Sequence, residues 1–425
     1  MISKLLAGLA AISFTTVSAA QGAPAVAADT IKEGFSTARL AAFGEQIRAD
    51  VKSGRLPGAV ILVARNGKVV YSETIGEQDP KTKAPMRKDS IFRIYSMTKP
   101  IVSVAVMMLV EEGRLQITEP ISKYIPELKN LKVGVEKTGD GGSKTLELVP
   151  AAREITIQDL LRHTSGLTYG VFGKSLVKDE YNKAGVDSRD QSNAEVMQKL
   201  ANVPLQFQPG TMWEYSRSVD VLGHLLERVS GKPLDQYLQE RIFKPLGMKD
   251  SGFWVAPEKH NRIAEAFETD PDTKAKVSLI EIRSAPKLLS GGGGGVSTAQ
   301  DYLRFTQMLL NGGQLDGVRL LSKKTVEYMM SDHLGALQET SLQRGPAYLP
   351  GPGYGFGLGF AVRTETGEAG TPGTIGDANW GGLGGTYFWV DPEEKLAVVW
   401  MAQGPGQRGY YRGVLRNRIY GAMVK

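Results

Sequence analysis

The chain has 425 residues, a formal net charge of +6 and no cysteine. The lack of thiols excludes disulfides, a cysteine nucleophile, cysteine-ligated zinc and an N-terminal lipoprotein anchor. Hydrophobic residues make up 41% and charged residues 23% of the chain, as in ordinary globular proteins. Acidic and basic residues are interspersed, without a long basic run, so the mild positive charge does not indicate a nucleic-acid partner.

The N-terminus has the order of a secretory signal peptide. Lys4 is followed by an apolar run from Leu5 to Phe14, and small-x-small sequences at 18–20 and 25–27 offer cleavage sites. This order predicts a signal peptide covering residues 1–28 and a periplasmic or secreted protein. A membrane anchor is the alternative, but the apolar run is short for a bilayer span. We therefore expect no stable membrane span after cleavage.

A helix followed by a β-hairpin is predicted next. Apolar residues at helical spacing predict a helix within about 28–57. Residues 59–64 then form a β-branched run, Asn66-Gly67 is a typical two-residue turn, and the chain returns over 68–71. This order indicates an antiparallel sheet with a helix packed on it.

The segment from Ser96 to Gly113 carries the strongest chemical signal. Ser96 precedes an apolar helix that Pro100 helps to start and Gly113 ends, and Lys99 lies about one turn beyond Ser96. A serine hydroxyl needs an adjacent base to act as a nucleophile. The amine of Lys99 can serve when burial and the helix N-terminus disfavour its positive charge. The pattern is thus that of a Ser–Lys nucleophile, beside a backbone N–H that can stabilise an oxyanion.

By itself, however, Ser-x-x-Lys is a weak signal. It recurs at Ser175 and Lys178 and at Ser284 and Lys287, although neither occurrence opens a strong apolar helix. A plain helix N-cap explains Ser96 about as well as a nucleophile does. The pattern alone therefore leaves both interpretations open.

Four further segments hold candidates with open roles. His163 ends a short capped helix, where we favour a bond to the helix end over catalysis. Tyr215 follows a Pro-Gly turn, and its phenol either shuttles protons or packs and caps a helix. The glycine run 291–295 lacks the lysine of a phosphate loop, so we prefer close packing or a crossing between lobes. Glycines near 381–385 mark either close approach of a substrate or a β-bulge.

Taken together, the motifs resemble those of one superfamily and occur along the chain in the same order as they do there. Nearly the whole mature chain is similar to the serine β-lactamases and penicillin-binding proteins. It is most similar to the class C β-lactamase-related branch, which includes the family VIII carboxylesterases. The residues that carry the resemblance are Ser96-Met97-Thr98-Lys99, Leu160 to Leu167, Tyr215-Ser216, the glycine run with 297–301, and Trp380-Gly381-Gly382.

The resemblance implies an α+β fold of the β-lactamase/transpeptidase type. An antiparallel sheet flanked by helices would carry an inserted, mostly helical domain. We expect residues 29–95 and 286–425 to form the sheet lobe and residues 96–285 the helical lobe. The active site would lie in the cleft between them. Within the helical lobe, the polar, glycine-rich stretch 136–144 is expected to be a surface loop.

The resemblance also assigns roles at the site. Ser96 would be the acylated nucleophile, Lys99 its general base, and Tyr215 a partner in the proton relay. The N–H groups of Ser96 and Leu383 would form the oxyanion hole. The resemblance implies no metal and no cofactor.

Two departures from the β-lactamase pattern bear on the substrate. Tyr215-Ser216-Arg217 stands where β-lactamases have Tyr-x-Asn, and Trp380-Gly381-Gly382 replaces the Lys-Thr-Gly of their substrate strand. The replaced polar groups help β-lactamases to hold the lactam amide and carboxylate. Their loss favours esters of uncharged or aromatic acyl groups, and esterase members of the branch commonly carry Trp-Gly-Gly here. Arg217 remains a candidate for binding an anion, which keeps lactam hydrolysis open.

Three hypotheses for the function follow. The first is a carboxylesterase that cleaves small-molecule esters through an acyl-enzyme on Ser96. The second keeps this machinery but acts on a β-lactam or a D-amino-acid peptide. The third is a non-catalytic penicillin- or peptidoglycan-binding protein, which the intact set of Ser96, Lys99 and Tyr215 argues against. The sequence does not indicate an oligomeric state.

Overall fold

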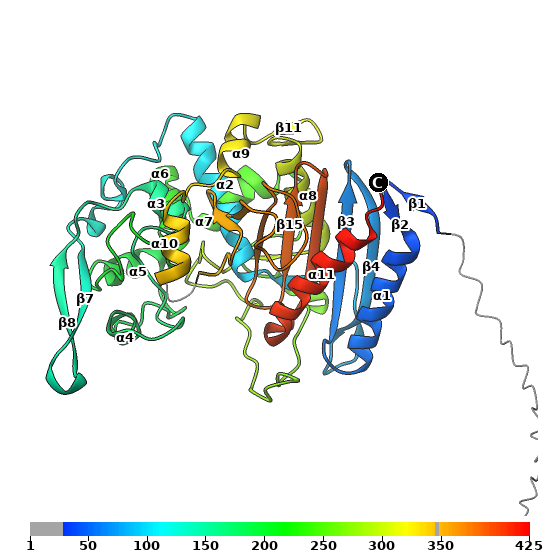
Figure 1. Ribbon diagram of the computed structural model, residues 1–425, viewed down its shortest axis with the longest axis horizontal. Coiled ribbons are helices and arrows are strands. Elements are labelled where there is room, and N and C mark those ends of the chain that lie inside the picture. The colour runs from blue at the N-terminus through cyan, green and yellow to red at the C-terminus, as the bar shows by residue number, and fades with distance from the viewer. Residues whose placement is uncertain (1–28, 345–347) are drawn as a thin grey trace, which may run out of the picture.

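The computed structural model describes residues 29–344 and 348–425 (Figure 1). The predicted signal peptide, residues 1–28, lies outside the described residues. Within the described ranges, no helix is long and apolar enough to cross a membrane. A sheet layered with helices occupies the right of Figure 1, and a group of helices with a projecting hairpin occupies its left.

One eight-stranded sheet is the centre of the first part. Its strands follow the order β12-β13-β14-β15-β16-β3-β4-β5, and every neighbouring pair is antiparallel. The predicted α+β class with an antiparallel sheet is therefore confirmed. The strands are β3 Gly58–Arg65, β4 Lys68–Asp79, β5 Ala84–Pro85, β12 Tyr354–Phe356, β13 Ala361–Arg363, β14 Ala378–Gly381, β15 Tyr387–Asp391 and β16 Leu396–Ala402.

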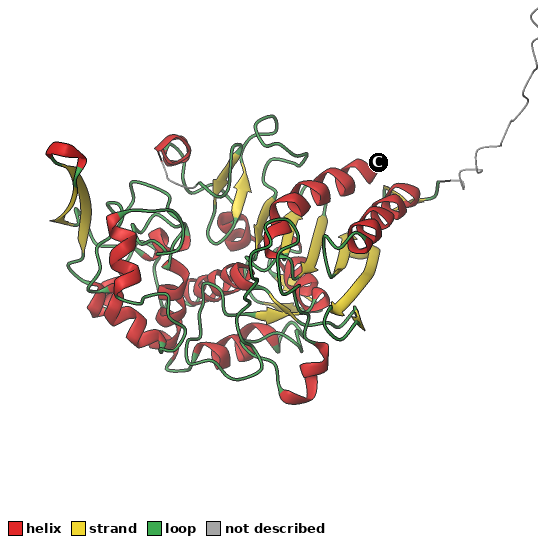
Figure 2. Ribbon diagram, turned by 90° about the horizontal axis from the view of Figure 1, so that it is seen from below, coloured by secondary structure: helices red, strands yellow, loops and turns green. Residues whose placement is uncertain are grey.

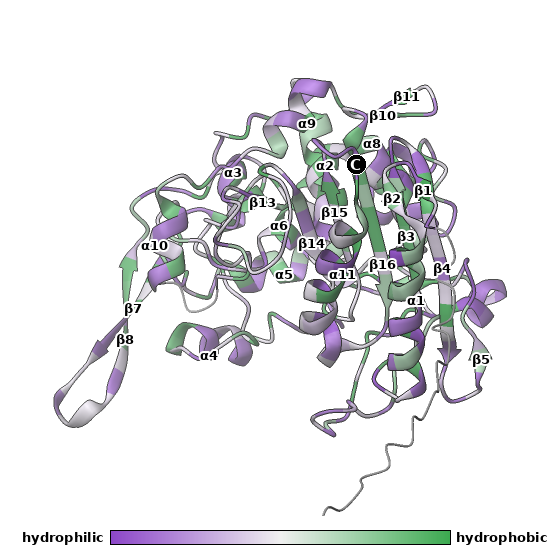
Figure 3. Cartoon of the chain, turned by 45° about the vertical axis from the view of Figure 1, so that its right-hand side comes forward, coloured by the Kyte–Doolittle hydropathy of each residue, from purple (hydrophilic) through white to green (hydrophobic). Residues whose placement is uncertain are grey.

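Helices cover both faces of this sheet (Figure 2). α1 (Thr37–Lys52) and α11 (Arg408–Ala422) lie on one face, where Trp400 belongs to the buried core. α8 (Ala299–Leu310) packs on the other face, with the Tyr302 ring 5.1 Å from the Phe388 ring. Because both faces are covered, the central strands are buried on both sides and show as hydrophobic in Figure 3.

The predicted N-terminal helix and hairpin are both present. α1 starts only at Thr37, because the preceding residues pair as a small hairpin of β1 (Ile31–Lys32) and β2 (Phe35–Ser36). Asn66 and Gly67 join β3 to β4 with φ values of 53° and 76°. Positive φ at both central residues is the requirement of a type I′ turn, which suits strand twist. The hairpin prediction is thus confirmed.

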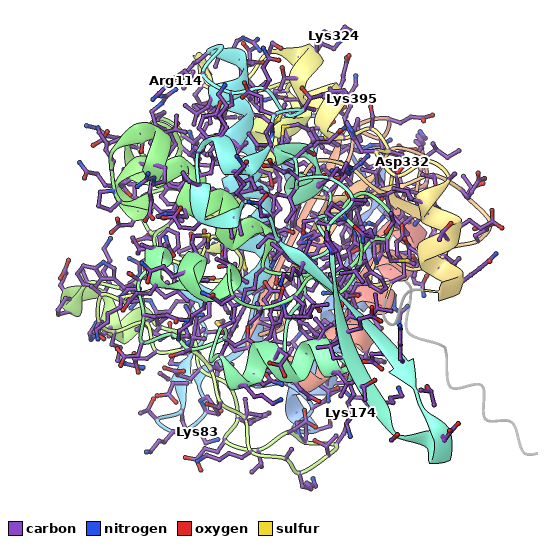
Figure 4. The ribbon with its side chains drawn as sticks, turned by 90° about the vertical axis from the view of Figure 1, so that its left-hand side faces the viewer. Lys83, Arg114, Lys174, Lys324, Asp332 and Lys395 are labelled. Carbon is purple, nitrogen blue, oxygen red and sulfur yellow. The ribbon has the colours of Figure 1, made fainter. Side chains whose placement is uncertain are left out.

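The second part of the molecule packs around α2 (Thr98–Glu111), which is buried along nearly its whole length. A long hairpin of β7 (Lys132–Thr138) and β8 (Lys144–Pro150) projects from this part (Figures 1 and 4). The expectation of a surface loop over residues 136–144 is therefore wrong except at the hairpin tip. Oppositely charged side chains pair across the two strands near the tip, whereas Val133 and Gly134 at the base of β7 are buried.

The remaining elements are short. The helices are α3 Ile157–Leu161, α4 Leu176–Lys183, α5 Asn193–Leu200, α6 Ser218–Ser230, α7 Leu234–Leu238, α9 Lys323–Met329, α10 Leu337–Arg344 and the π-helical turn η5 Gln239–Phe243. The 3-10 turns are η1 Tyr95–Met97, η2 Ile121–Lys123, η3 Pro126–Leu128, η4 Asp140–Gly142, η6 Pro257–Arg262 and η7 Pro405–Gln407. The two-residue strands are β6 Phe92–Arg93, β9 Val296–Ser297, β10 Gln314–Leu315 and β11 Val318–Arg319.

The two predicted lobes are in contact through α10. Ser341 on α10 lies in the range predicted for the sheet lobe. Its hydroxyl accepts a hydrogen bond from the backbone N–H of Trp213 at 2.9 Å. Trp213 lies in the range predicted for the helical lobe. The lobe boundaries at residues 95 and 286 stay predictions.

Candidate active site

Ser96 lies where a short strand meets a buried helix. β6 pairs with β9 and leads into η1, whose middle residue is Ser96. Tyr95, just before it, has a φ of 44°, which is costly for a bulky side chain and typical of functional sites. The N-cap residue of α2 is Met97, and no side chain caps this helix. Ser96 is therefore not a plain helix cap.

Two polar groups from different elements meet the Ser96 hydroxyl. The Tyr215 hydroxyl donates to Ser96 Oγ at 2.6 Å, and Lys99 Nζ lies 3.3 Å from the same oxygen. The indole N–H of Trp380 donates to the Tyr215 oxygen at 3.3 Å. The structure thus brings together four residues that the sequence predicted for the site. The serine proton has two possible acceptors here, as nucleophilic catalysis by serine requires.

Lys99 is buried, and no described carboxylate lies within ion-pair distance of its amine. The residue is 1% exposed, and its amine donates to the Gly292 carbonyl. The Tyr169 hydroxyl lies 3.3 Å from Nζ, and the centre of the Tyr215 ring lies 4.5 Å from it. All these neighbours are neutral, whereas a carboxylate would hold the amine as a permanent cation. The amine is therefore placed to exchange a proton with Ser96 and Tyr215.

The glycine run forms the wall behind Lys99. A Cβ on Gly291 would lie 2.6 Å from the Val219 carbonyl oxygen of α6, so only glycine allows this approach. The Gly292 N–H and the Ser290 hydroxyl both donate to one oxygen of Asp220, at 3.1 and 2.5 Å. The Gly292 carbonyl, which belongs to the next peptide, accepts from Lys99. Of the two interpretations of the run, close packing is the one that the structure supports.

The Asp220 side chain, which accepts these two hydrogen bonds, is fully buried. Burial would raise the pKa of its carboxyl, but the charge of Arg217 and the hydrogen bond from Ser290 outweigh it and hold the pKa below its usual value. Asp220 therefore stays ionised and anchors the glycine run whose Gly292 carbonyl accepts from Lys99.

Tyr215 is held by packing and by a buried ion pair. Its ring stacks 6.0 Å from Trp213 and lies 5.5 Å from Trp380. The preceding residue, Glu214, binds Lys178 Nζ of α4 at 2.6 Å, and both side chains are less than 5% exposed. Tyr215 therefore packs its ring, as one interpretation of the sequence had it, and also presents its hydroxyl to Ser96.

The strand that carries Trp380-Gly381-Gly382 lies against the segment before Ser96. A Cβ on Gly382 would lie 2.4 Å from the Ile94 carbonyl oxygen. β14 and β15 pair without a register shift up to Gly381, so Gly382 marks close approach of the Ile94 backbone rather than a β-bulge. Close approach of a substrate to this strand stays a prediction. The next residue, Leu383, has a side chain that is 45% exposed. The N–H groups of Ser96 and Leu383 stay the predicted oxyanion hole.

Arg217 is engaged by carboxylates. Its guanidinium binds Asp187 at 2.5 Å and Asp220 at 3.2 Å, and the side chain is buried. A guanidinium that two carboxylates already hold is poorly suited to capture a substrate anion. Arg217 thus supports the site through its ion pair with Asp220 and does not itself contact Ser96.

The rival candidates do not contact Ser96 within the described ranges, although the His163 ring lies 5.0 Å from the Tyr215 ring. Ser175 caps α4, and Ser284 is exposed, with Lys287 bound to Asp190 at 2.6 Å. His163 is buried, and its Nδ1 lies 3.2 Å from the Ser216 hydroxyl. Burial, and then the charge of Lys99, lower its pKa well below the usual value, so it is neutral.

Sequence reasoning missed several residues that support the site. Tyr169 contacts Lys99 and Glu214 fixes Tyr215, and nothing local in the sequence marks them, whereas Gly292 belongs to the glycine run that the sequence singled out. Asp220 has a usable signal, because it is a carboxylate inside the otherwise apolar stretch 219–226. Among the described residues, no group of three or more histidines and carboxylates is arranged to hold a metal ion.

Comparisons with known proteins agree with this geometry. A family model described as Beta-lactamase matches residues 43–419. Esterase EstB of Burkholderia gladioli is 33% identical over 90% of this chain and 95% of its own. Lovastatin esterase of Penicillium rubens is 30% identical over 83% of this chain and 90% of its own. The structure of EstCE1, described as a hydrolase with promiscuous acyltransferase activity, has a TM-score of 0.74 at 26% identity, covering 90% of this chain and 99% of its own. The chain therefore belongs to the β-lactamase family.

Proposed function

We propose that this protein is a serine carboxylesterase that cleaves small esters through an acyl-enzyme on Ser96. The observation that carries the proposal is the double contact of Ser96 Oγ, with Tyr215 at 2.6 Å and Lys99 at 3.3 Å. Two similar proteins are named esterases, which supports the choice of bond.

The reaction runs in two balanced halves. Ser96 Oγ forms a bond to the ester carbonyl carbon, and its proton passes to the pair of Lys99 and Tyr215. The N–H groups of Ser96 and Leu383 stabilise the oxyanion. The bond to the alcohol then breaks, and the alcohol leaves with that proton. Water attacks the acyl-enzyme, gives a proton to the same pair, and Ser96 recovers it as the acid leaves.

The surroundings of Tyr215 support apolar or aromatic acyl groups. Trp380 occupies the position at which the β-lactamases that this chain resembles carry a lysine. The Phe172 ring lies 5.9 Å from the Tyr215 ring, and Val171 beside it is exposed. Apolar side chains at a reactive serine stabilise a bound apolar acyl group by removing its surface from water.

Rates on two kinds of substrate separate this proposal from its rivals. Short- and medium-chain nitrophenyl esters are compared with a chromogenic cephalosporin, for wild type and Ser96→Ala. We expect ester turnover to dominate and to vanish in the variant. Faster turnover of the cephalosporin would favour a β-lactamase or a D-amino-acid peptidase.

A covalent probe tests the non-catalytic alternative directly. A serine-reactive phosphonate is expected to add its mass to a peptide that contains Ser96, and not to Ser96→Ala. The absence of any labelling would favour a penicillin- or peptidoglycan-binding protein that does not turn over substrate.

We also propose that residues 1–28 direct export and are removed, which leaves a periplasmic or secreted enzyme. The order of charge, apolar run and small residues supports this. N-terminal sequencing of the mature protein from periplasmic and medium fractions tests it. Recovery of the intact N-terminus in the membrane fraction would argue for an anchor instead.

A further inference from the structure

Two tight turns carry the N–H groups that the resemblance assigns to the oxyanion hole. One turn covers residues 94–97 and the other residues 382–385, and in each the last N–H donates to the first carbonyl, at 3.0 and 3.1 Å. Ser96 is a central residue of the first turn and Leu383 of the second. Within the described ranges, neither of their N–H groups donates to a backbone carbonyl. Both donors are therefore available to a substrate oxygen.

The side chain of Tyr95 connects the two turns. A Cβ on Gly384 would lie 2.8 Å from Tyr95 Cε2 and 2.9 Å from Cδ2, so the tyrosine ring packs directly on the second turn. Tyr95 is the residue before Ser96, and Gly384 is the residue after Leu383. The contact therefore joins the immediate neighbours of the two donors. Tyr95 is 9% exposed, so its ring belongs to the packed wall of the site.

Hydrogen bonds hold Tyr95 at its ring and at its backbone. Its hydroxyl accepts the Ile280 N–H at 2.9 Å, and the Ile280 carbonyl is itself bound by Arg93 at 2.6 Å. The Tyr95 carbonyl accepts from the Thr98 hydroxyl at 2.6 Å, and that hydroxyl accepts the Gly295 N–H at 2.9 Å. With both ends fixed in this way, the ring has a defined position against the second turn.

The backbone of Tyr95 is in a conformation that a smaller residue would adopt more easily. Its φ of 44° lies in the left-handed region, where a bulky side chain is strained and glycine or asparagine is not. Such conformations concentrate at active sites, where the surrounding contacts enforce them. What glycine or asparagine would lack at this position is the ring that packs on Gly384.

Resting on the proposed esterase function, we propose that Tyr95 is a positioning residue for the oxyanion hole. Its ring sets the separation of the two turns, and thereby the distance between the N–H groups of Ser96 and Leu383. Both donors have to lie about 2.7–3.1 Å from one developing oxyanion. A change in their separation therefore weakens binding of the transition state more than binding of the ester. Tyr95 needs no contact with the substrate for this role.

Substitutions at Tyr95 test the role of the ring. Asparagine tolerates the positive φ but is too short to pack on Gly384. Tyr95→Asn is therefore expected to lower kcat on 4-nitrophenyl butyrate about 10- to 100-fold, with KM within about 3-fold of wild type. Tyr95→Phe keeps the ring and loses only the bond to Ile280, so its loss should stay below about 5-fold. An unchanged kcat in Tyr95→Asn, or a raised KM in place of a lowered kcat, would overturn the proposal.

Tyr237→Asn is the control for the loss of a buried tyrosine ring. Tyr237 is 3% exposed and packs under Arg241, which pairs with Glu112 at the end of α2 far from Ser96. This variant should lower the free energy of unfolding and leave kcat and KM unchanged. A similar fall in kcat in Tyr237→Asn would attribute the effect of Tyr95→Asn to general destabilisation and overturn the proposal.

Gly384→Ala tests the same contact from the other turn. The φ of Gly384 is not in the left-handed region, so alanine is tolerated there, but its Cβ meets the Tyr95 ring. We expect kcat to fall about 10-fold in the wild-type background and less than about 3-fold in Tyr95→Asn, where the ring is gone. Equal losses in both backgrounds would show that the two residues act independently and would overturn the proposal.

Binding of butylboronic acid separates failure of this inference from failure of the esterase proposal. Ser96 Oγ bonds to boron, its proton passes to Lys99 and Tyr215, and the tetrahedral adduct presents an oxygen to the same two N–H donors. Calorimetric titration requires no turnover. Tyr95→Asn is expected to raise Kd about 10- to 100-fold, even if wild type hydrolyses no ester. Equal Kd values for wild type and Tyr95→Asn, or no binding to either, would overturn the role of Tyr95.

Discussion

Of the three segments that carry the Ser-x-x-Lys pattern, those of Ser96 and Ser175 receive different surroundings from the fold. Ser175 is the N-cap of α4, where its Oγ accepts a backbone N–H of the first turn at 3.1 Å. Its hydroxyl donates to Gln206 at 2.6 Å. Ser96 caps no helix, and its Oγ faces Tyr215 and Lys99 instead. The first serine caps a helix and binds a glutamine side chain, whereas the second presents its oxygen to a lysine and a tyrosine.

The two lysines differ in the same way. Lys178 is buried against Glu214 at 2.6 Å, so its charge is fixed in an ion pair. Lys99 is equally buried, but its neighbours among the described residues are hydroxyls, an aromatic ring and a carbonyl. The comparison teaches that a carboxylate, brought by another segment, separates a structural lysine from one that can move protons. It also shows that the second pattern serves the first, since Glu214 precedes Tyr215.

The largest expected difference is between the two serines. Ser96→Ala is expected to lower kcat on a nitrophenyl ester by at least about 10⁴-fold, because the nucleophile is lost. Ser175→Ala should leave kcat unchanged and lower the free energy of unfolding by about 1 kcal/mol, the usual cost of losing an N-cap. Steady-state kinetics and urea unfolding check both. A catalytically dead Ser175→Ala that folds normally would reverse the assignment.

The next largest effect is expected at Lys99. Lys99→Met keeps much of the side-chain volume but removes the amine, so we expect kcat to fall about 10³-fold. KM should change little, because Lys99 acts on the serine proton and not on the bound ester. A raised KM with an unchanged kcat would show that Lys99 only shapes the site.

The ion pair behind Tyr215 is expected to affect stability first. Lys178→Met leaves the Glu214 carboxylate buried without a partner, which should lower the free energy of unfolding by about 3–5 kcal/mol. The double variant Lys178→Met/Glu214→Gln removes the unpaired charge and should recover part of the loss. Denaturant unfolding of both variants measures this. No recovery in the double variant would contradict an ion pair that is held by mutual charge.

The smallest effect concerns the tyrosine hydroxyls. Tyr215→Phe removes the group 2.6 Å from Ser96 Oγ and should lower kcat about 10²-fold. Tyr169→Phe is the matched control, because its hydroxyl contacts Lys99 but not Ser96, and its loss should be clearly smaller. A larger loss of activity in Tyr169→Phe than in Tyr215→Phe would show that the proton relay runs through Tyr169, contrary to our mechanism.

Elements with local signals could be predicted from the sequence. The Asn66-Gly67 turn and the apolar helix after Ser96 each depend on a few neighbouring residues, and both are present. The hairpin of β7 and β8 could not be predicted in the same way. Its strands carry only a few alternating apolar residues, at 133, 135, 146 and 148, and the polar, glycine-rich stretch between them has the composition of a loop.

The candidate site, too, could be predicted from the sequence only in part. The order of motifs along the chain brought Ser96, Lys99, Tyr215 and Trp380 into one prediction, and the structure places these side chains in contact. Their catalytic roles stay predictions until the variants are measured. Arg217 was a candidate for binding a substrate anion, but the structure pairs it with Asp187 and Asp220. The sequence did not indicate these partners, because a side chain's partners, unlike its position in a motif, come from distant segments.

The sequence by itself indicated the local elements, since periodicity, caps and turn residues act over short distances. The order of its motifs pointed, through a family resemblance, to the fold class and to the Ser96 segment. Only the tertiary structure decided which lysine meets a carboxylate and which arginine does not. Lys99 and Lys178 look alike in sequence, as do Arg412 and Arg416 on one helix, yet Glu214 and Asp377 reach only one of each pair. Charge depends on what packing brings within a few ångströms, and that packing joins residues far apart in the chain.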